Sequence, residues 1–252
     1  MKVLAIVFTV RREGKSMTLQ ATGEICRNIR SAWGGDTETE IVTMSERPVQ
    51  PCAGCKTCFC DGVCPQDRLD GMAELRQMVK KCDALIVATP VYMTMVSGWC
   101  KNFLDRCASY CHVFELTGKP CLVISVTSIS GGRQTSAYLS EMMEVMGCAV
   151  AGRLPLQQYA GEGPVIGSEE AQAAVQSAIA SLRDAVANPE RYISEKAEQQ
   201  FASIRDYHRR AEILNTLSGK KCSWETDTFR ERGYIHCASL REALKKEDRS
   251  DE

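Results

Sequence analysis

The chain has 252 residues, with 31 Lys and Arg residues against 32 Asp and Glu residues and a formal net charge of -1. This balance provides no overall field that would favour nucleic acid or an anionic membrane surface as a partner. The length suits one α/β domain with an appended segment and leaves too few residues for two full-sized domains.

The chain begins with an apolar run over residues 3–10, directly followed by Arg11-Arg12-Glu13. Because no small-residue cleavage site intervenes, we interpret residues 2–8 as a buried first strand and not as a secretion signal. No apolar stretch approaches the roughly 20 residues needed to cross a bilayer. We therefore expect a cytoplasmic protein whose 14 cysteines are mainly reduced.

Apolar runs of strand length alternate with longer segments of helical period, a pattern typical of a parallel sheet covered on both faces. Strands are predicted over residues 2–8, 40–44, 84–89, 120–127 and 148–156. Helices are predicted over residues 16–33, 97–110 and 135–146, with two more that begin at the caps Asp70 and Ser168. The pattern predicts a doubly wound α/β domain with five strands, over residues 1–187.

The composition changes at Asn188-Pro189, after which charges of both signs are dense and no strand-like run occurs. We interpret residues 188–252 as a charged helical extension without a core of its own. His208 and His236 lie in this segment, and we expect both side chains to be solvated.

Five cysteines lie within residues 52–64, and Pro51 and Pro65 bracket them. Four of them have the spacing C-x2-C-x2-C-x5-C, which supplies the thiolates that an iron-sulfur cluster requires. Two short spacers in succession favour a cluster, because zinc ribbons usually separate two C-x2-C pairs widely. Zinc also prefers four thiolates, and a redox disulfide relay needs only two, so both remain as alternatives.

The turn after the first strand reads Thr-Val-Arg-Arg-Glu-Gly-Lys-Ser over residues 9–16. It offers backbone N–H groups, hydroxyls and cationic side chains to a phosphate, and the following helix adds its dipole. A triphosphate loop would have glycine in place of Thr9 and an aspartate for magnesium after strand 84–89, where Thr-Pro stands instead. The dinucleotide pattern G-x-G-x-x-G is also absent from this turn. A monophosphate therefore fits the loop best.

Ligands of doubly wound sheets bind beyond the carboxyl ends of the strands, where the strand order reverses. We expect three loops to converge there, over residues 9–16, 89–94 and 128–132. Tyr92 offers a ring for stacking on a flat heterocycle, and Gly131-Gly132 permits close approach of the backbone to its edge.

A second group of cysteines lies on the predicted helix 97–110 and just beyond it. Cys100, Cys107 and Cys111 are spaced so that they share one helix face, with His112 adjacent. A second metal site is one interpretation, but packing of these thiols in the core is the favoured one.

Several of these segments together resemble the NADPH-dependent FMN reductase-like family, which has a flavodoxin-like fold. The similarity lies in residues 9–16, in Thr89-Pro-Val-Tyr92 and in the helix Lys101-Asn-Phe-Leu-Asp-Arg106. The cysteine loop resembles that of the iron-sulfur flavoprotein branch. The resemblance covers about residues 1–160 and implies the strand order 2-1-3-4-5, an FMN cofactor and a homodimer or homotetramer.

The resemblance also implies which residues bind the cofactors. FMN would be held by Thr9, Arg11, Gly14, Lys15 and Ser16 at the phosphate, by Pro90, Val91, Tyr92, Met93 and Thr94 at the ribityl chain and ring, and by Ser128, Gly131 and Gly132 at the ring edge. A 4Fe-4S cluster would be held by Cys52, Cys55, Cys58 and Cys64. The chain departs from the family pattern at Val10, Lys15 and Cys60, and Cys60 leaves the identity of the fourth cluster ligand open.

We expect a flavin-dependent oxidoreductase that takes electrons from a ferredoxin or NAD(P)H and passes them to a small-molecule or oxygen-species acceptor. FMN would convert between two-electron and one-electron chemistry, the cluster would be the one-electron port, and no acid–base triad is expected. One alternative is a flavodoxin-like electron carrier without its own substrate. Another is an NAD(P)H-dependent flavin or quinone reductase whose cysteine loop is stabilised by zinc.

Overall fold

The structure, a computed structural model, describes residues 1–12, 14–158 and 164–247. Its strands are β1 (Lys2–Val7), β2 (Glu38–Thr43), β3 (Ala84–Tyr92), β4 (Met95–Val96), β5 (Pro120–Thr127) and β6 (Ala149–Gln157). Its α-helices are α1 (Met17–Trp33), α2 (Thr57–Cys60), α3 (Met72–Lys81), α4 (Gly98–Arg106), α5 (Tyr110–Val113), α6 (Gly132–Val145), α7 (Glu169–Ala187), α8 (Glu195–Ser218), α9 (Trp224–Glu231) and α10 (Leu240–Glu247). Short 3-10 helices are η1 (Pro65–Arg68), η2 (Pro189–Tyr192) and η3 (Tyr234–His236).

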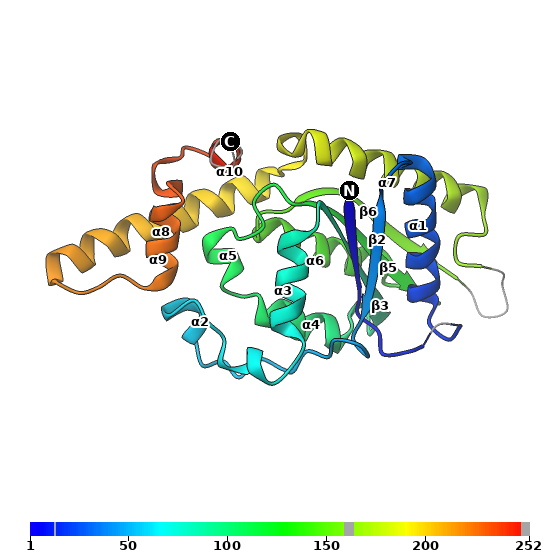
Figure 1. The fold of residues 1–252 in the computed structure, drawn as a ribbon, viewed down its shortest axis with the longest axis horizontal. Helices are drawn as coiled ribbons and strands as arrows, with labels where there is room; N and C mark the ends of the chain where they lie inside the picture. Colours follow the sequence, from blue (N-terminus) through cyan, green and yellow to red (C-terminus); the bar gives the residue numbers. More distant parts are fainter. Residues whose placement is uncertain (13, 159–163, 248–252) are drawn as a thin grey trace.

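The parallel strands form one sheet in the order β2-β1-β3-β5-β6 (Figure 1). Numbered along the chain, this is the predicted order 2-1-3-4-5, so the flavodoxin-like doubly wound fold is confirmed. The two-residue strand β4 pairs antiparallel with the end of β3 and was not predicted. The strand order reverses between β1 and β3, which places the expected ligand edge at their carboxyl ends.

Apolar side chains from the sheet pack into a separate layer on each face. Along β1, Leu4 and Ile6 join the layer beneath α3, α4 and α6, whereas Ala5 and Val7 join the layer beneath α1 and α7. Because both faces are buried, the strands appear in the sequence as continuous apolar runs. Each fully buried large aliphatic side chain contributes about 1.5–3 kcal/mol to folding relative to exposure.

Several predicted boundaries differ from the observed ones. Strand β3 continues through the predicted turn as far as Tyr92, and α6 begins at Gly132 instead of residue 135. The predicted helix 97–110 is interrupted, because α4 ends at Arg106 and α5 starts only at Tyr110.

The interruption separates the second group of cysteines. Cys100 and Cys107 are buried and Cys111 is half-buried, but the three do not share a single helix. Burial raises the pKa of Cys107 to about 12, so this thiol stays protonated at neutral pH. The structure supports core packing and not a second metal site.

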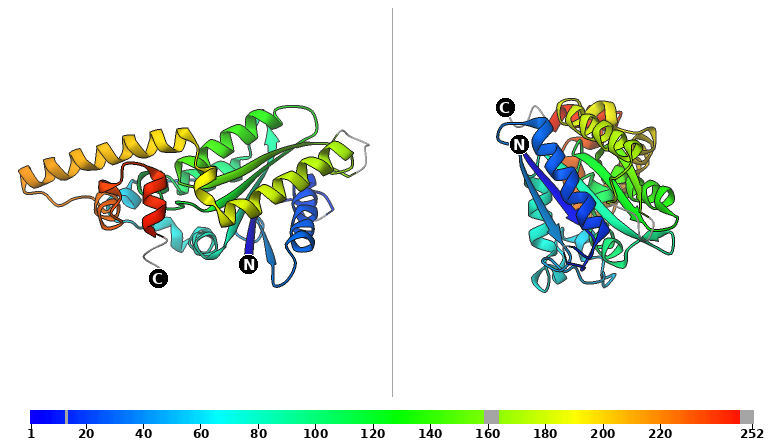
Figure 2. Two further views of the ribbon diagram at one scale, coloured as in Figure 1. Left: turned by 90° about the horizontal axis from the view of Figure 1, so that it is seen from above. Right: turned by 90° about the vertical axis from the view of Figure 1, so that its right-hand side faces the viewer.

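The extension is helical as predicted, but the expectation that it lacks a core was wrong. Its helices bury an apolar cluster centred on Phe201, which contacts the rings of Phe229 and Tyr234 and of Phe114 from the main domain. Helix α8 carries this cluster near its start and projects beyond the sheet domain at its far end (Figure 2). None of the described helices combines the length and apolar character needed to cross a bilayer.

The prediction of a solvated His208 was also wrong. His208 is fully buried, with Nδ1 at 3.0 Å from Thr226 Oγ1 and Nε2 at 2.9 Å from the carbonyl oxygen of His112. Burial lowers the pKa of this imidazole. His236 is exposed, as expected.

Replacing Phe201 with alanine tests whether the extension is an integral part of the fold. Phe201→Ala should lower the free energy of unfolding by about 3–5 kcal/mol, because it leaves a cavity in a fully buried cluster. Chemical denaturation measures this change, and Phe201→Leu, which retains most of the volume, should cost less. An alanine variant as stable as the parent would contradict the packing described here.

Candidate functional site

The turn after β1 is held by two buried hydroxyl groups. Thr9 Oγ1 accepts hydrogen bonds from the Arg11 backbone N–H at 3.2 Å and from Ser16 Oγ at 3.5 Å. Ser16 is the N-cap of α1, where its Oγ accepts a hydrogen bond from the Leu19 backbone N–H at 3.2 Å. The two hydroxyls thereby bring the two ends of the loop together at the positive end of the helix dipole.

The middle of this turn presents its cationic side chains to solvent. Gly14 has φ of +80°, a conformation that glycine adopts without a Cβ penalty, and the next N–H, of Lys15, donates to the Arg12 carbonyl at 3.1 Å. Arg11 and Lys15 are both exposed. An exposed pair of cations at a helix N-terminus is a suitable environment for a phosphate group.

The side chains of Arg11 and Arg12 line a groove of about 350 Å³ between α1 and β2. Thr43 and Ser45, at the end of β2, lie on its other side. The groove thus lies on the β2 side of the first loop, whereas the other two expected loops follow β3 and β5.

The second expected loop is a hairpin formed by the end of β3 and β4. The chain reverses through Met93 and Thr94, whose φ values are +50° and +60°. Such values are uncommon for residues other than glycine and mark a locally strained backbone. Tyr92 and Met93 are 53% and 95% exposed, so the hairpin directs large apolar side chains outward.

The third loop, after β5, lies directly against this hairpin. Gly131 has φ of +86°, and a Cβ atom there would lie 2.8 Å from the Cα atom of Thr94. The loop is fixed by Thr127, whose Oγ1 accepts from the Ile129 N–H at 3.2 Å and donates to the Ser130 carbonyl at 2.8 Å. Only glycine meets both the conformational and the steric requirement at position 131.

Ser97, the N-cap of α4, joins the first loop to the second. Its Oγ donates to the Phe8 carbonyl at 2.9 Å, and its N–H donates to Thr89 Oγ1 at 3.1 Å. Together with the contact between Gly131 and Thr94, these bonds bring all three loops to one edge of the sheet. Exposed apolar side chains gather in these loops and in β4, namely Val10, Tyr92, Met93, Met95 and Ile129. Such a group marks a ligand or interaction surface.

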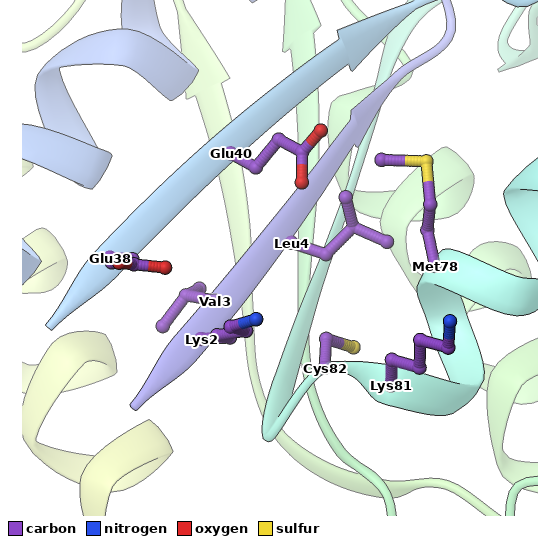
Figure 3. Close-up of a pocket in the computed structure, with 8 residues that line it drawn as sticks. All are labelled: Lys2, Val3, Leu4, Glu38, Glu40, Met78, Lys81 and Cys82. Atoms are coloured by element: carbon purple, nitrogen blue, oxygen red, sulfur yellow. The ribbon is translucent and has the colours of Figure 1, made fainter.

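A different pocket lies toward the amino ends of β1 and β2 (Figure 3). Lys2, Glu38, Lys81 and Cys82 contribute to its walls. Because β1 and β2 are parallel, their amino ends lie at the edge of the sheet opposite the three loops. This pocket is therefore separate from the expected site.

The base of the cysteine loop is fixed by the buried side chain of Arg106. Its guanidinium pairs with Asp70 at 2.6 Å and with Asp67 at 2.7 Å. Asp70 also accepts a hydrogen bond from the backbone N–H of Gln50, which precedes the loop, at 2.8 Å. It accepts another from the backbone N–H of Met72, which follows the loop, at 3.0 Å. Burial alone raises the pKa of Asp70, but these hydrogen bonds from Arg106 and the backbone hold it below its usual value.

Two amide side chains complete the attachment of this loop. Asn102, on α4, donates to the Val49 carbonyl at 3.1 Å. Gln66 accepts from the Ala53 N–H at 2.9 Å and donates to the Pro51 carbonyl at 3.0 Å. Asn102 and Arg106 belong to the segment 101–106 used for the family resemblance, but their role in anchoring the loop was missed. The sequence did contain a signal for this role, because Arg106 is a charged residue on the apolar side of the predicted helix 97–110.

Cys58 interacts electrostatically with two of the other expected cluster ligands. Burial raises the pKa of Cys58, and the thiols of Cys64 and Cys52 act in the same direction. Cys55 is exposed; a hydrogen bond from Thr57 lowers its pKa, and the charge of Arg106 acts in the same direction. Arg106 also interacts with Cys64, so its charge acts on two of the four expected ligands.

Cys60 is the last residue of α2, a helix that contacts α9 of the extension. Burial and Glu225 raise the pKa of Tyr207 on α8, and Cys60 contributes to that shift. Phe59, the preceding residue, contacts the ring of His112, with 4.9 Å between the ring centroids. Cys60 therefore interacts with Tyr207 of the extension.

Within the described ranges, no group of three or more His, Cys, Asp or Glu side chains is arranged in metal-binding geometry. The chemistry of the loop nevertheless suits a cluster, because several thiols lie beside a buried guanidinium that offsets thiolate charge. Gly54, Lys56 and Gly62 have positive φ values of 67°, 62° and 72°, which curve the chain between these thiols. The same donor set also suits zinc.

Comparison with known proteins assigns the fold to a family. Residues 1–160 match the family of NADPH-dependent FMN reductases, and this segment contains the three loops and the cysteine loop. The chain belongs to the NADPH-dependent FMN reductase family. The predicted family is therefore confirmed. Membership of this family also supports the prediction that the protein is a flavin-dependent oxidoreductase.

Relatives of this FMN reductase family member are named iron-sulfur flavoproteins. One from Archaeoglobus fulgidus is 32% identical over 116 residues, which are 46% of this chain and 52% of the relative. One from Methanocaldococcus jannaschii is 29% identical over 172 residues, which are 65% of this chain and 82% of the relative. The chain thus spans about half the length of the first relative and most of the second. The resemblance to the iron-sulfur flavoprotein branch is confirmed.

Two solved structures share the fold of this family member. RosB, with bound 8-demethyl-8-formylriboflavin-5'-phosphate, has a TM-score of 0.56 and 16% identity and covers 75% of this chain and 79% of its own. An oxidoreductase from Corynebacterium diphtheriae has a TM-score of 0.50 and 19% identity, and covers 74% of this chain and 96% of its own. At these identities the likeness shows the fold alone.

Replacing Arg106 with methionine tests the attachment of the cysteine loop. Arg106→Met should lower the free energy of unfolding by about 3–5 kcal/mol, because it leaves the buried Asp70 carboxylate without its counter-charge. Urea denaturation measures the loss. Arg68→Met, at an exposed position of η1, is the control and should have little effect. A loss for Arg106→Met no greater than for the control would contradict the anchoring role.

Proposed function

We propose that this protein is a flavin-dependent oxidoreductase that binds FMN across the loops 9–16, 89–94 and 128–132. The observation that carries this proposal is the meeting of these loops at one sheet edge, with Gly131 closely packed against Thr94. The family match spans all three loops. RosB, a protein of the same fold, holds a modified riboflavin 5'-phosphate.

The predicted binding residues divide into three groups in this proposal. The phosphate is assigned to the first loop, where the hydroxyls of Thr9 and Ser16 meet at the N-terminus of α1. The ribityl chain and ring are assigned to residues 90–94, in which Tyr92 is half-exposed and available for stacking. The ring edge is assigned to Ser128, Gly131 and Gly132. When bound, FMN supplies hydride and single-electron chemistry, while the protein supplies orientation and electrostatics.

We further propose that Cys52, Cys55, Cys58 and Cys64 bind an iron-sulfur cluster of the 4Fe-4S type. The thiol of Cys58 interacts with those of Cys52 and Cys64, and Arg106 acts on Cys55 and Cys64. The names of the relatives support iron-sulfur chemistry. Cys60 is left out, because it lies toward Tyr207. Zinc in the same four-thiolate set is the alternative that the first experiment below distinguishes.

Electrons are proposed to come from a ferredoxin or NAD(P)H and to pass to a small-molecule or oxygen-species acceptor. Turnover with NAD(P)H and an added acceptor separates this enzyme from a carrier without its own substrate. The proposed location is the cytoplasm. A homodimer or homotetramer is proposed because Met93 and Ile129 are 95% and 80% exposed at the edge where the loops meet, as in an interaction surface. We place the boundary between the FMN domain and the helical extension at residues 187 and 188.

Separate substitutions of Cys55 and Cys60 distinguish a proposed cluster ligand from the extra cysteine of the loop. In anaerobically purified protein, Cys55→Ser should lose iron and acid-labile sulfide but keep FMN, because the flavin loops lie elsewhere. Cys60→Ser, the matched control, should keep iron, sulfide and FMN. Metal and sulfide analysis with a visible spectrum provides the measurement. Zinc without sulfide in the parent protein would refute the cluster, and joint loss of iron and FMN would contradict separate sites.

Replacement of adjacent arginines tests the phosphate assignment. Arg11→Ala should weaken FMN binding by about tenfold, the effect of losing about 1.4 kcal/mol from a charge-assisted contact. Titration of the FMN-free protein, followed by flavin fluorescence, measures the dissociation constant. Arg12→Ala provides a neighbour of equal charge and should change the affinity less. Equal effects of the two variants would show that Arg11 acts only through its charge.

A further inference from the structure

A pocket of about 150 Å³ lies between the cysteine loop, α3, α5 and α9. It is separate from the edge where the three flavin loops meet, and the proposed binding of FMN leaves it unoccupied. Its chemically distinctive lining consists of two rings, two cations, a hydroxyl and a thiol, from Trp224, Tyr110, Arg76, Lys80, Ser109 and Cys58.

The aromatic wall of this pocket comes from the extension. Trp224 is the first residue of α9, and its indole lies directly against Gly62 of the cysteine loop. A Cβ atom at Gly62 would lie 2.4 Å from the indole Nε1, so no other residue fits there without displacing the ring. Figure 1 shows α9 beside α2. The extension thus closes one side of a pocket whose other sides belong to the main domain.

The charged wall comes from α3, where Arg76 and Lys80 lie one helical turn apart. Arg76 is oriented by an ion pair with Asp67, and its guanidinium lies 5.7 Å from the centre of the Tyr110 ring. Lys80 remains about half-exposed. Arg76 thus directs positive charge toward the Tyr110 ring, whereas Lys80 pairs with Glu115.

Glu115 is the acidic side chain in the lining, and cations already engage it. It pairs with Lys80 and with Arg232, whose Nη2 lies 2.7 Å from its carboxylate. The lining therefore carries more positive than negative charge. An anionic group is favoured there over a cationic one.

We propose that this pocket binds a small aromatic anion of about the size of benzoate. Its ring would lie against Trp224 and Tyr110, and its carboxylate toward Lys80. The volume agrees with this class, since a cavity of about 150 Å³ accommodates one benzene ring. The ligand would lie beside Cys58. The proposal concerns binding alone and does not depend on the FMN or cluster proposals.

Calorimetric titration of the full-length protein with benzoate tests the proposal. We expect saturable binding to one site per chain. Lys80→Ala should weaken it by about fivefold, as expected for one partly exposed charge contact. Lys81→Ala is the matched control, because Lys81 follows directly on α3 but lines the separate pocket in Figure 3. Trp224→Ala should abolish binding, whereas Trp224→Phe should retain part of it.

Several outcomes would overturn the proposal. These are absence of saturable binding in the parent protein, equal weakening by Lys80→Ala and Lys81→Ala, or binding of neutral benzamide as tight as that of benzoate. The titration measures benzoate binding alone, whereas iron and acid-labile sulfide measure the cluster. Failure of the cluster proposal is therefore distinguishable from failure of this one.

Discussion

The complete burial of the Arg106 guanidinium is the constraint on which the arrangement of the two candidate sites depends. A charge removed from water needs partners, and Asp67 and Asp70 supply them from the segment that leaves the cysteine loop. Arg106 ends α4, while Ser97 caps its start between the first two flavin loops. This nine-residue helix, about 13 Å long, therefore sets the relation between the flavin loops and the cysteine loop.

Much of the sheet domain was predictable from local patterns. The predicted strand 120–127 coincides with β5, because a strand buried on both faces appears as an uninterrupted apolar run. Ser16 and Ser168 marked helix starts through capping. Strand β3 was predicted too short because Thr89-Pro90 suggests a turn. Pro90 is tolerated because the pairing of β3 with β1 ends at Ala88.

The features missed in the sequence depend on contacts between distant segments. Arg106 lies 39 residues from Asp67, and His208 lies 96 residues from the His112 carbonyl that it contacts. No local period reveals either pairing. The cysteine spacing likewise left Cys60 and Cys64 equivalent as ligands. Helix α2 separates Cys58 from Cys60, because residues two apart on a helix point in different directions.

The contact between Trp224 and Gly62 couples the sequence evolution of two parts of the chain, the extension and the cysteine loop. The indole occupies the space that a side chain at position 62 would need, so this position stays glycine for as long as the tryptophan is present. A descendant that lost the extension would be released from this steric requirement, although the φ of +72° would still favour glycine or asparagine. Substitutions at these two positions are therefore expected to arise in order, with loss of the indole first.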